Sequence, residues 1–127
     1  MAEAEKLRGE SMNGPGSLID WTAALDAAGD DAELLEELVG VFLEESPILM
    51  QQIQKGLEVS DSSLVRRASH TLKGSLRIFE ASSGVDLAFE LEKLGQQGEL
   101  AGGDDLLEDL QTYMDRVTAE LNGYLKR

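Results

Sequence analysis

The chain has 127 residues, of which 42% are hydrophobic and only 5% aromatic, so we expect a single domain with an aliphatic core. It contains no cysteine and one histidine, which excludes disulfides and argues against a structural zinc site. With 25 acidic and 11 basic residues, its net charge of −14 makes nucleic acids and anionic membranes poor partners.

The N-terminal stretch is rich in glycine, serine and proline, as in "GESMNGPGS". We therefore predict a flexible tail or linker over residues 1–17 and a folded domain over 18–127. The first ten residues are too polar for a signal peptide. The longest apolar run, residues 38–43, is too short to cross a bilayer, so we predict a cytoplasmic protein.

The first half of the domain carries helix start and stop signals. Asp20 can cap a short helix that Gly29 ends. An aspartate of the pair 30–31 can cap the next helix, in which apolar residues recur at i, i+4 and i+8. Ser46 followed by Pro47 predicts a break and a new helix, because serine suits an N-cap and proline the first helical position.

The second half predicts three more helices. Asp61 can cap the helix that carries His70. Ser82 or Ser83 starts the next helix, and Ser83 with Asp86 resembles a capping box. A glycine-rich connection, residues 95–105, ends in an aspartate pair that can start a long last helix. Since strand-like alternation is missing from the sequence, we predict an all-α fold: an antiparallel four-helix bundle with one or two additional short helices.

The helix around His70 differs in charge from the rest of the chain. Residues 62–79 contain four basic residues, no acidic residue and the only histidine. At about 100° per residue, Arg66, His70, Lys73 and Arg77 fall in one arc opposite the apolar side chains. We therefore expect His70 to be exposed and surrounded by cations.

Gly74 follows His70 by one turn, close to the same face. A glycine inside a helix costs about 1 kcal/mol relative to alanine, which suggests that a side chain there would obstruct a group approaching His70. A neutral imidazole can act as a nucleophile, and nearby cations attract a phosphoryl group. The combination indicates a phosphate acceptor.

Each of these features also has an ordinary explanation. A lone histidine is most often a plain surface or core residue, and a basic cluster can be a solvated face that answers acids on adjacent helices. A helical glycine can simply allow close packing. Their coincidence on one face within three turns favours the chemical interpretation.

The segment "HTLKGS" at 70–75 resembles the signature of the histidine-containing phosphotransfer (HPt) domain of two-component signalling. The stretch "LLEELVGVFLEESPILMQQI" at 34–53 resembles the helices that precede it in that family. Asp61, Leu64 and the "LE" at 91–92 also fit the pattern, so the resemblance covers roughly residues 18–125. It implies four antiparallel helices plus one or two short ones.

The resemblance also implies a mechanism. His70 would accept a phosphoryl group on Nε2 from a receiver-domain phospho-aspartate and pass it to another receiver aspartate. Lys73 would balance the phosphate charge, and Gly74 would let the receiver approach. Glu92 would fix the imidazole tautomer through Nδ1–H, or would be a plain solvent-exposed carboxylate. The chain would then be a covalent carrier and not an enzyme. It would bind no cofactor or metal itself, the Mg²⁺ belonging to the receiver.

The implied partners are response-regulator receiver domains and a hybrid histidine kinase. A partner-binding face around His70 would suit an acidic receiver surface, and its expected residues are Arg66, Arg67, Ser69, Arg77 and Ile78. Two alternatives stay open. The chain could be a helical docking module that is not phosphorylated, or the phosphoacceptor input domain of a chemotaxis-type histidine kinase.

Two positions depart from the family pattern. Glu80 stands where a glycine is usual, and Gly84 stands where an apolar residue is usual. That glycine typically ends the helix in a left-handed turn. With Glu80 the helix could either continue past this position or end by another route, and we expect the chemistry at His70 to be retained in both cases.

Overall fold

The computed structural model of the chain describes residues 17–126, so the predicted tail lies outside the described residues except for Ser17. Those residues form five helices and no strand. The helices are α2 (Trp21–Ala27), α3 (Ala32–Glu58), α4 (Ser62–Ile78), α5 (Ser82–Gln97) and α6 (Gly103–Leu125).

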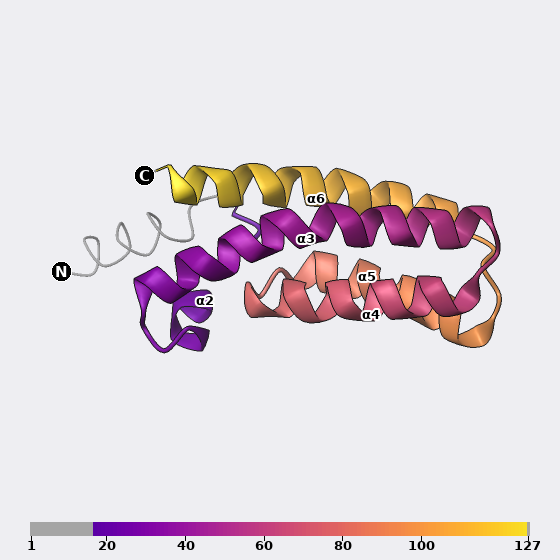
Figure 1. The fold of residues 1–127 in the computed structure, drawn as a ribbon, viewed down its shortest axis with the longest axis horizontal. Coiled ribbons are helices and arrows are strands. Elements are labelled where there is room, and N and C mark those ends of the chain that lie inside the picture. Colours follow the sequence, from indigo (N-terminus) through magenta and orange to yellow (C-terminus); the bar gives the residue numbers. More distant parts are fainter. Residues whose placement is uncertain (1–16, 127) are drawn as a thin grey trace.

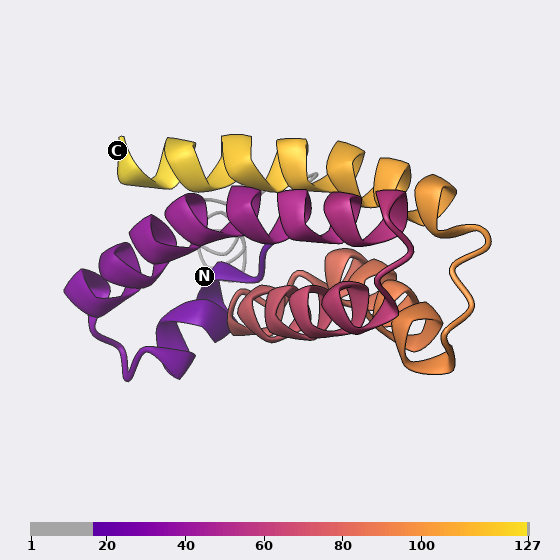
Figure 2. The ribbon, with the colours of Figure 1, turned by 45° about the vertical axis from the view of Figure 1, so that its right-hand side comes forward.

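The four long helices form an antiparallel bundle. Helices α3 and α6 lie side by side, and α4 and α5 lie side by side below them (Figure 1). Each long helix contacts its two neighbours around the bundle, while the short α2 packs near the start of α3 (Figure 2). The predicted all-α bundle with an additional short helix is confirmed.

The core is built from aliphatic stripes. Burying one such side chain contributes roughly 1.5–3 kcal/mol, and every long helix supplies several of them. Those with no exposed surface are Leu35, Val39 and Ile53 of α3, Val65, Leu72 and Leu76 of α4, Ala88 and Leu91 of α5, and Leu110, Val117 and Leu121 of α6.

The predicted break at Ser46 and Pro47 is wrong, because α3 continues through both residues for 27 residues in all. Pro47 cannot donate the usual backbone hydrogen bond, which normally costs a helix about 3 kcal/mol or more. The buried stripes on both sides of Pro47 pack on the same core and hold the helix together. The helix bends along its length (Figure 2), as a helix with an internal proline commonly does.

Aspartates cap the first three helices, as predicted. The Asp20 side chain accepts a hydrogen bond from the Ala23 N–H at 3.0 Å. The Asp61 side chain likewise accepts from the Leu64 N–H at 3.0 Å, and Asp31 caps α3.

The starts of the last two helices differ in detail from the prediction. Helix α5 begins at Ser82, one of the two predicted positions, but Ser83 lies inside the helix and the predicted capping box with Asp86 is wrong. Helix α6 begins at Gly103, which places both predicted cap aspartates in its first turn. Acidic side chains there still favour the helix through its dipole.

Glu80 ends α4 in the conformation that a glycine normally supplies. Its φ of +50° is left-handed. The Ala81 N–H donates to the Leu76 carbonyl at 3.1 Å, and the Glu80 N–H donates to that of Arg77 at 3.0 Å. The turn is therefore formed without glycine, at a cost of roughly 1–2 kcal/mol for the left-handed residue.

Gly84 is explained by the aromatic side chain that packs on it. A Cβ at Gly84 would collide with the ring of Tyr113 from α6 and lie 3.1 Å from Leu76 Cδ1. The space that an apolar side chain would fill at this position is occupied by Tyr113. This departure therefore concerns the contact of α5 with α6, eight residues before Glu92 along α5.

A strap formed by residues 17–21 joins the start of the domain to α6. One carboxylate, that of Glu120, accepts hydrogen bonds from the Ser17 hydroxyl at 2.5 Å, the Leu18 N–H at 2.8 Å and Trp21 Nε1–H at 2.7 Å. The Trp21 ring also stacks on Tyr124 with centroids 4.4 Å apart. The strap is thereby fixed at several points on one helix.

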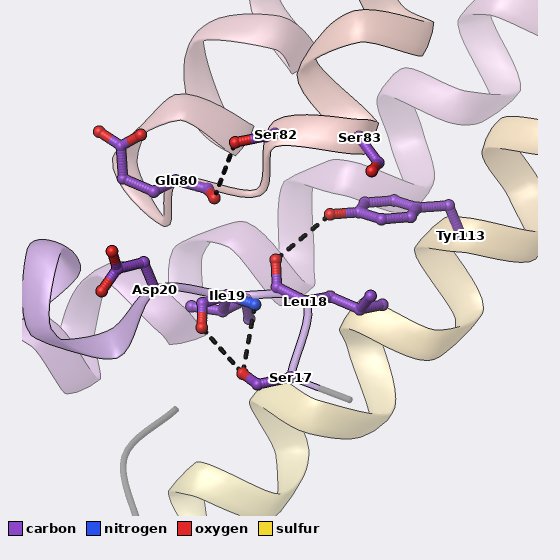
Figure 3. A pocket seen from close by; sticks show the side chains of 8 residues that line it. All are labelled: Ser17, Leu18, Ile19, Asp20, Glu80, Ser82, Ser83 and Tyr113. Atoms are coloured by element: carbon purple, nitrogen blue, oxygen red, sulfur yellow. Dashed lines mark hydrogen bonds between the residues drawn. The ribbon is translucent and has the colours of Figure 1, made fainter. Parts of the chain in front are cut away.

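The strap borders a surface hollow of about 380 Å³ (Figure 3). There the Tyr113 hydroxyl donates to the Leu18 carbonyl at 3.3 Å, and Ser82 Oγ donates to that of Glu80 at 3.5 Å. Glu80 follows His70 by ten residues, about 15 Å along a helix. The hollow is therefore separate from the His70 face. Among the described helices, none is both long and apolar enough to cross a membrane.

Candidate functional site

His70 lies in the middle of α4 and points outward, as predicted, with 65% of its side chain exposed. Arg66 and Arg67 lie one turn before it on the exposed surface, and Gly74 lies one turn after it. The aliphatic stripe of α4 fixes this orientation, because burying that stripe leaves the opposite side of the helix to solvent.

Glu92 of α5 lies between His70 and Lys73. Its Oε2 is 2.8 Å from His70 Nδ1, and its Oε1 is 2.6 Å from Lys73 Nζ. Only 15% of the Glu92 side chain is exposed, so solvent screens these contacts weakly. The contact between Glu92 and the imidazole that the resemblance implied is present in the structure.

The close approach of α4 and α5 makes this contact possible. At Gly95, one turn after Glu92, an added Cβ would lie 2.6 Å from the Arg66 backbone nitrogen and 2.8 Å from the Ser62 carbonyl oxygen. The two backbones can approach this far only because position 95 has no side chain. Glycine at this position therefore brings the carboxylate of α5 within reach of the imidazole of α4.

The charge state of Glu92 follows from its neighbours. Burial raises the pKa of Glu92, but the hydrogen bonds and charges of Lys73 and His70 together outweigh burial and lower that pKa below its ordinary value. The carboxylate is then ionised at neutral pH and can only accept hydrogen bonds. His70 Nδ1 consequently carries the proton, and the lone pair of Nε2 is directed away from Glu92.

Lys73 is not on the exposed arc where the helical wheel placed it. The residue is only 8% exposed, and its ammonium group is held by Glu92 and lies 4.8 Å from the centroid of the Phe89 ring. The wheel was wrong because it treated α4 alone, whereas α5 covers this side of the helix.

Ser69 is also misplaced by the sequence-based prediction. It is fully buried, and within the described part of the chain its hydroxyl has no hydrogen-bond partner. Its side chain is therefore not available to a partner in this structure. The other expected contact residues are on the surface: Arg66, Arg67, Arg77 and Ile78.

Gly74 has open space where a side chain would project. A Cβ added there would meet no atom of the described chain within 4 Å, outside its own helix backbone and its chain neighbours. The alternative that this glycine permits close packing of helices inside the domain is therefore wrong. Its absence of a side chain has no explanation in the folded chain itself.

The sequence did not point to two further neighbours of His70. A hollow beside the imidazole lies between α3 and α4, where Leu49 and Gln52 of α3 face Arg67 and Thr71 of α4. Phe89 lies on the other side, over Lys73. The spacing of Phe89 three residues before Glu92, on one face of a helix, was the available signal.

No cluster of three or more histidine, cysteine, aspartate or glutamate residues that could hold a metal ion occurs among residues 17–126. The arrangement at His70 offers nucleophilic and electrostatic chemistry. An oriented imidazole with one free ring nitrogen, a buried carboxylate and a neighbouring ammonium group suit the capture of an electrophilic group.

The chain is similar to known proteins in sequence and in fold. The model of the Hpt domain family matches residues 37–120. The crystal structure of histidine-containing phosphotransfer protein B (HptB) from Pseudomonas aeruginosa PAO1 is similar in fold, with a TM-score of 0.82 at 18% sequence identity. The match covers 89% of this chain and 98% of that one. No curated protein matches the chain significantly in sequence.

Proposed function

The chain belongs to the Hpt domain family, and on this premise we propose that His70 is its phosphoacceptor. It accepts a phosphoryl group from a receiver-domain phospho-aspartate and passes it to another receiver aspartate. The chain is thus a covalent carrier whose active site is completed by the partner.

One observation carries this proposal: the Glu92 carboxylate contacts Nδ1 of the His70 imidazole, and the rest of the ring is largely exposed. The ionised carboxylate accepts a hydrogen bond from Nδ1–H, which leaves Nε2 as the nucleophilic nitrogen. The exposed side of the ring is the side from which a partner can approach.

The transfer balances without any further reactant. The Nε2 lone pair attacks phosphorus, the P–O bond to the aspartyl group breaks, and its electron pair leaves with the aspartate carboxylate. The imidazole gains positive charge. The Glu92 carboxylate offsets this charge while it accepts the hydrogen bond from Nδ1–H. In the onward step the P–N bond breaks and its electron pair returns to Nε2.

Gly74 and Lys73 have different supporting roles. Since a side chain at Gly74 would meet nothing inside the domain, its open space serves the approaching receiver. Lys73 pairs with Glu92 in the free chain, so it first orients the carboxylate. To contact the phosphoryl group directly, its ammonium group would have to leave Glu92.

The partner docks on the exposed face around His70, which we define as Arg66, Arg67, Arg77 and Ile78. Its cations suit the acidic cluster of a receiver and accelerate encounter with it. A hybrid histidine kinase is the expected source of a donor receiver. The Mg²⁺ that phosphoryl transfer requires is supplied with the receiver, where it neutralises charge on the phosphoryl oxygens.

Intact mass spectrometry tests the proposal. Wild type and His70→Gln are incubated with Mg²⁺ and a panel of phosphorylated receiver domains. An acid-labile gain of one phosphoryl group in wild type and none in the variant is the expected result. A receiver that binds wild type stably and yet transfers nothing would replace the proposal with the docking-module alternative. Phosphorylation by an ATP-bound kinase catalytic domain, and by no receiver, would favour the chemotaxis-type input domain.

A further inference from the structure

Phe89 differs from the other two phenylalanines of the chain in its exposure. Phe42 and Phe79 are core residues, 4% and 1% exposed, and contact each other edge to face. Phe89 is 44% exposed on the outer side of α5. Its ring therefore contributes little to the core, and its position needs another explanation.

Two ammonium groups lie against the Phe89 ring. Lys73 Nζ of α4 is 4.8 Å from the ring centroid and Lys93 Nζ of α5 is 4.9 Å from it. Both distances are within the range of a cation–π contact. Lys93 is a surface residue that also pairs with Glu90 at 2.7 Å, whereas Lys73 pairs with the carboxylate that holds His70.

These contacts form a chain from the ring to the imidazole. The Phe89 ring contacts the Lys73 ammonium group, which contacts Glu92 Oε1, while Glu92 Oε2 contacts His70 Nδ1. A lysine has a long flexible side chain, so a single ion-pair partner does not restrict it to one rotamer. The ring removes that freedom by covering the ammonium group on a second side.

From this chain of contacts we propose that Phe89 is a positioning residue for His70. It holds Lys73 on Glu92, which keeps the carboxylate aligned with Nδ1 and so keeps Nε2 directed outward. This inference rests on the proposed function of His70 for its rate measurement, but its first readout is independent of any partner.

The test compares Phe89→Leu, which keeps apolar volume but removes the ring, with Phe89→Tyr, which keeps the ring. The first readout is the tautomer of His70 in the free protein, from its ring ¹⁵N chemical shifts. The second is the rate of phosphoryl transfer from a phosphorylated receiver. For Phe89→Leu we expect the Nε2–H tautomer population to rise, and the rate to fall, by about fivefold, the factor that a contact of about 1 kcal/mol supports. In Phe89→Tyr, both the Nε2–H tautomer population and the transfer rate should stay within about twofold of wild type.

Two further variants separate positioning from general structure. Lys93→Met removes the other cation from the ring and should leave the tautomer and rate unchanged. Adding Phe89→Leu to Lys73→Met should cause no further change, because the ring then has no ammonium group to hold. Circular dichroism melting checks that each variant is folded.

The proposal is overturned if Phe89→Leu leaves the ¹⁵N shifts of His70 at their wild-type values, or if Phe89→Tyr behaves like Phe89→Leu. It is also overturned if Phe89→Leu impairs Lys73→Met as strongly as it impairs wild type. A wild-type chain that accepts no phosphoryl group from any receiver would refute the proposed function alone, since the tautomer measurement still decides the role of Phe89.

Discussion

Two glycines, one on the outer side of α4 and one in α5 where it faces α4, have opposite surroundings. On the outer side, Gly74 leaves space that nothing in the described chain fills; on the side that faces α5, Gly95 admits a backbone so close that a methyl group would not fit. The inner contact is a requirement of the fold and brings Glu92 to His70. The space at Gly74 has no role in the described fold, which supports the proposal that a partner uses it.

Replacing His70 should have the largest effect on phosphoryl transfer and little effect on the packing of α4 against α5. We expect His70→Gln to abolish phosphate acceptance, because the amide has no nucleophilic nitrogen. The free energy of unfolding should change by less than about 1 kcal/mol, since the ring is mostly exposed. Mass spectrometry and urea denaturation measure the two. Unfolding of this variant would contradict the orientation of α4.

Gly95→Ala should break the inner contact. The added methyl group meets the backbone of α4, which cannot move as a side chain can, so we expect a loss of about 1–3 kcal/mol in the free energy of unfolding. Because the helices must separate, the His70–Glu92 contact should also weaken. Urea denaturation measures the first effect and His70 ¹⁵N shifts the second. Wild-type stability would show that the backbones are not in close contact.

Gly74→Ala should have the opposite effect on stability to Gly95→Ala. With no atom to collide with, the alanine should stabilise α4 by up to about 1 kcal/mol, while transfer from a receiver slows by about tenfold or more as the methyl group obstructs docking.

The matched control for that change is Gly40→Ala in α3, where an added Cβ also meets no atom of the described chain. It should give a similar gain in melting temperature and an unchanged transfer rate. Equal rates in the two variants would mean that the space at Gly74 is not used by the partner.

Glu92→Gln probes the carboxylate that the inner contact brings to His70. Because Lys73 and His70 lower its pKa despite burial, ionised Glu92 stabilises the fold above the ordinary value of 4.5 and loses this contribution as pH falls through the lower, folded value. Glu92→Gln should therefore be less stable than wild type near neutral pH, and the difference in free energy of unfolding should narrow as the pH falls below 4.5. Denaturation over a series of pH values on both sides of 4.5 measures this. A difference that widens in acid would contradict the sign of the shift.

The smallest effect is expected at the end of α4. Glu80→Gly relieves a left-handed residue but increases the freedom of the unfolded chain, so we expect a gain of no more than about 1 kcal/mol. Transfer should not change. A clear loss of stability, measured by thermal melting, would mean that the Glu80 side chain makes a contribution of its own.

Local sequence signals predicted those parts that depend on local chemistry. The caps at Asp20 and Asp61 and the exposure of His70 follow from neighbours within one or two turns. Lys73 and Ser69 were placed wrongly because their burial depends on where α5 crosses α4, a tertiary contact between distant residues. Pro47 was misjudged for the same reason, since packing of α3 on the core overrides a strong local signal.

The site divides along the same line. The sequence pattern alone singled out His70, Lys73 and Gly74, whereas the pairing of Glu92 with the imidazole was implied by the family resemblance. The sequence could place Phe89 and Glu92 on one face of a helix, but it could not place Lys73 against that face. The contacts of Lys73 with Glu92 and with the Phe89 ring depend on the distance between two helices. That distance is set by Gly95, which the sequence alone presented as one glycine among 13.

The strap on Glu120 has an optical consequence. Trp21 is the only tryptophan of the chain, and it is 5% exposed, stacked on Tyr124 and hydrogen-bonded through Nε1. Its fluorescence therefore reports attachment of the strap to α6 without interference from another indole. An emission that shifts to the red before the helices melt would show that the strap detaches first. Binding of a receiver at His70 could be followed by a label on the receiver. Trp21 fluorescence would then record independently whether the strap responds.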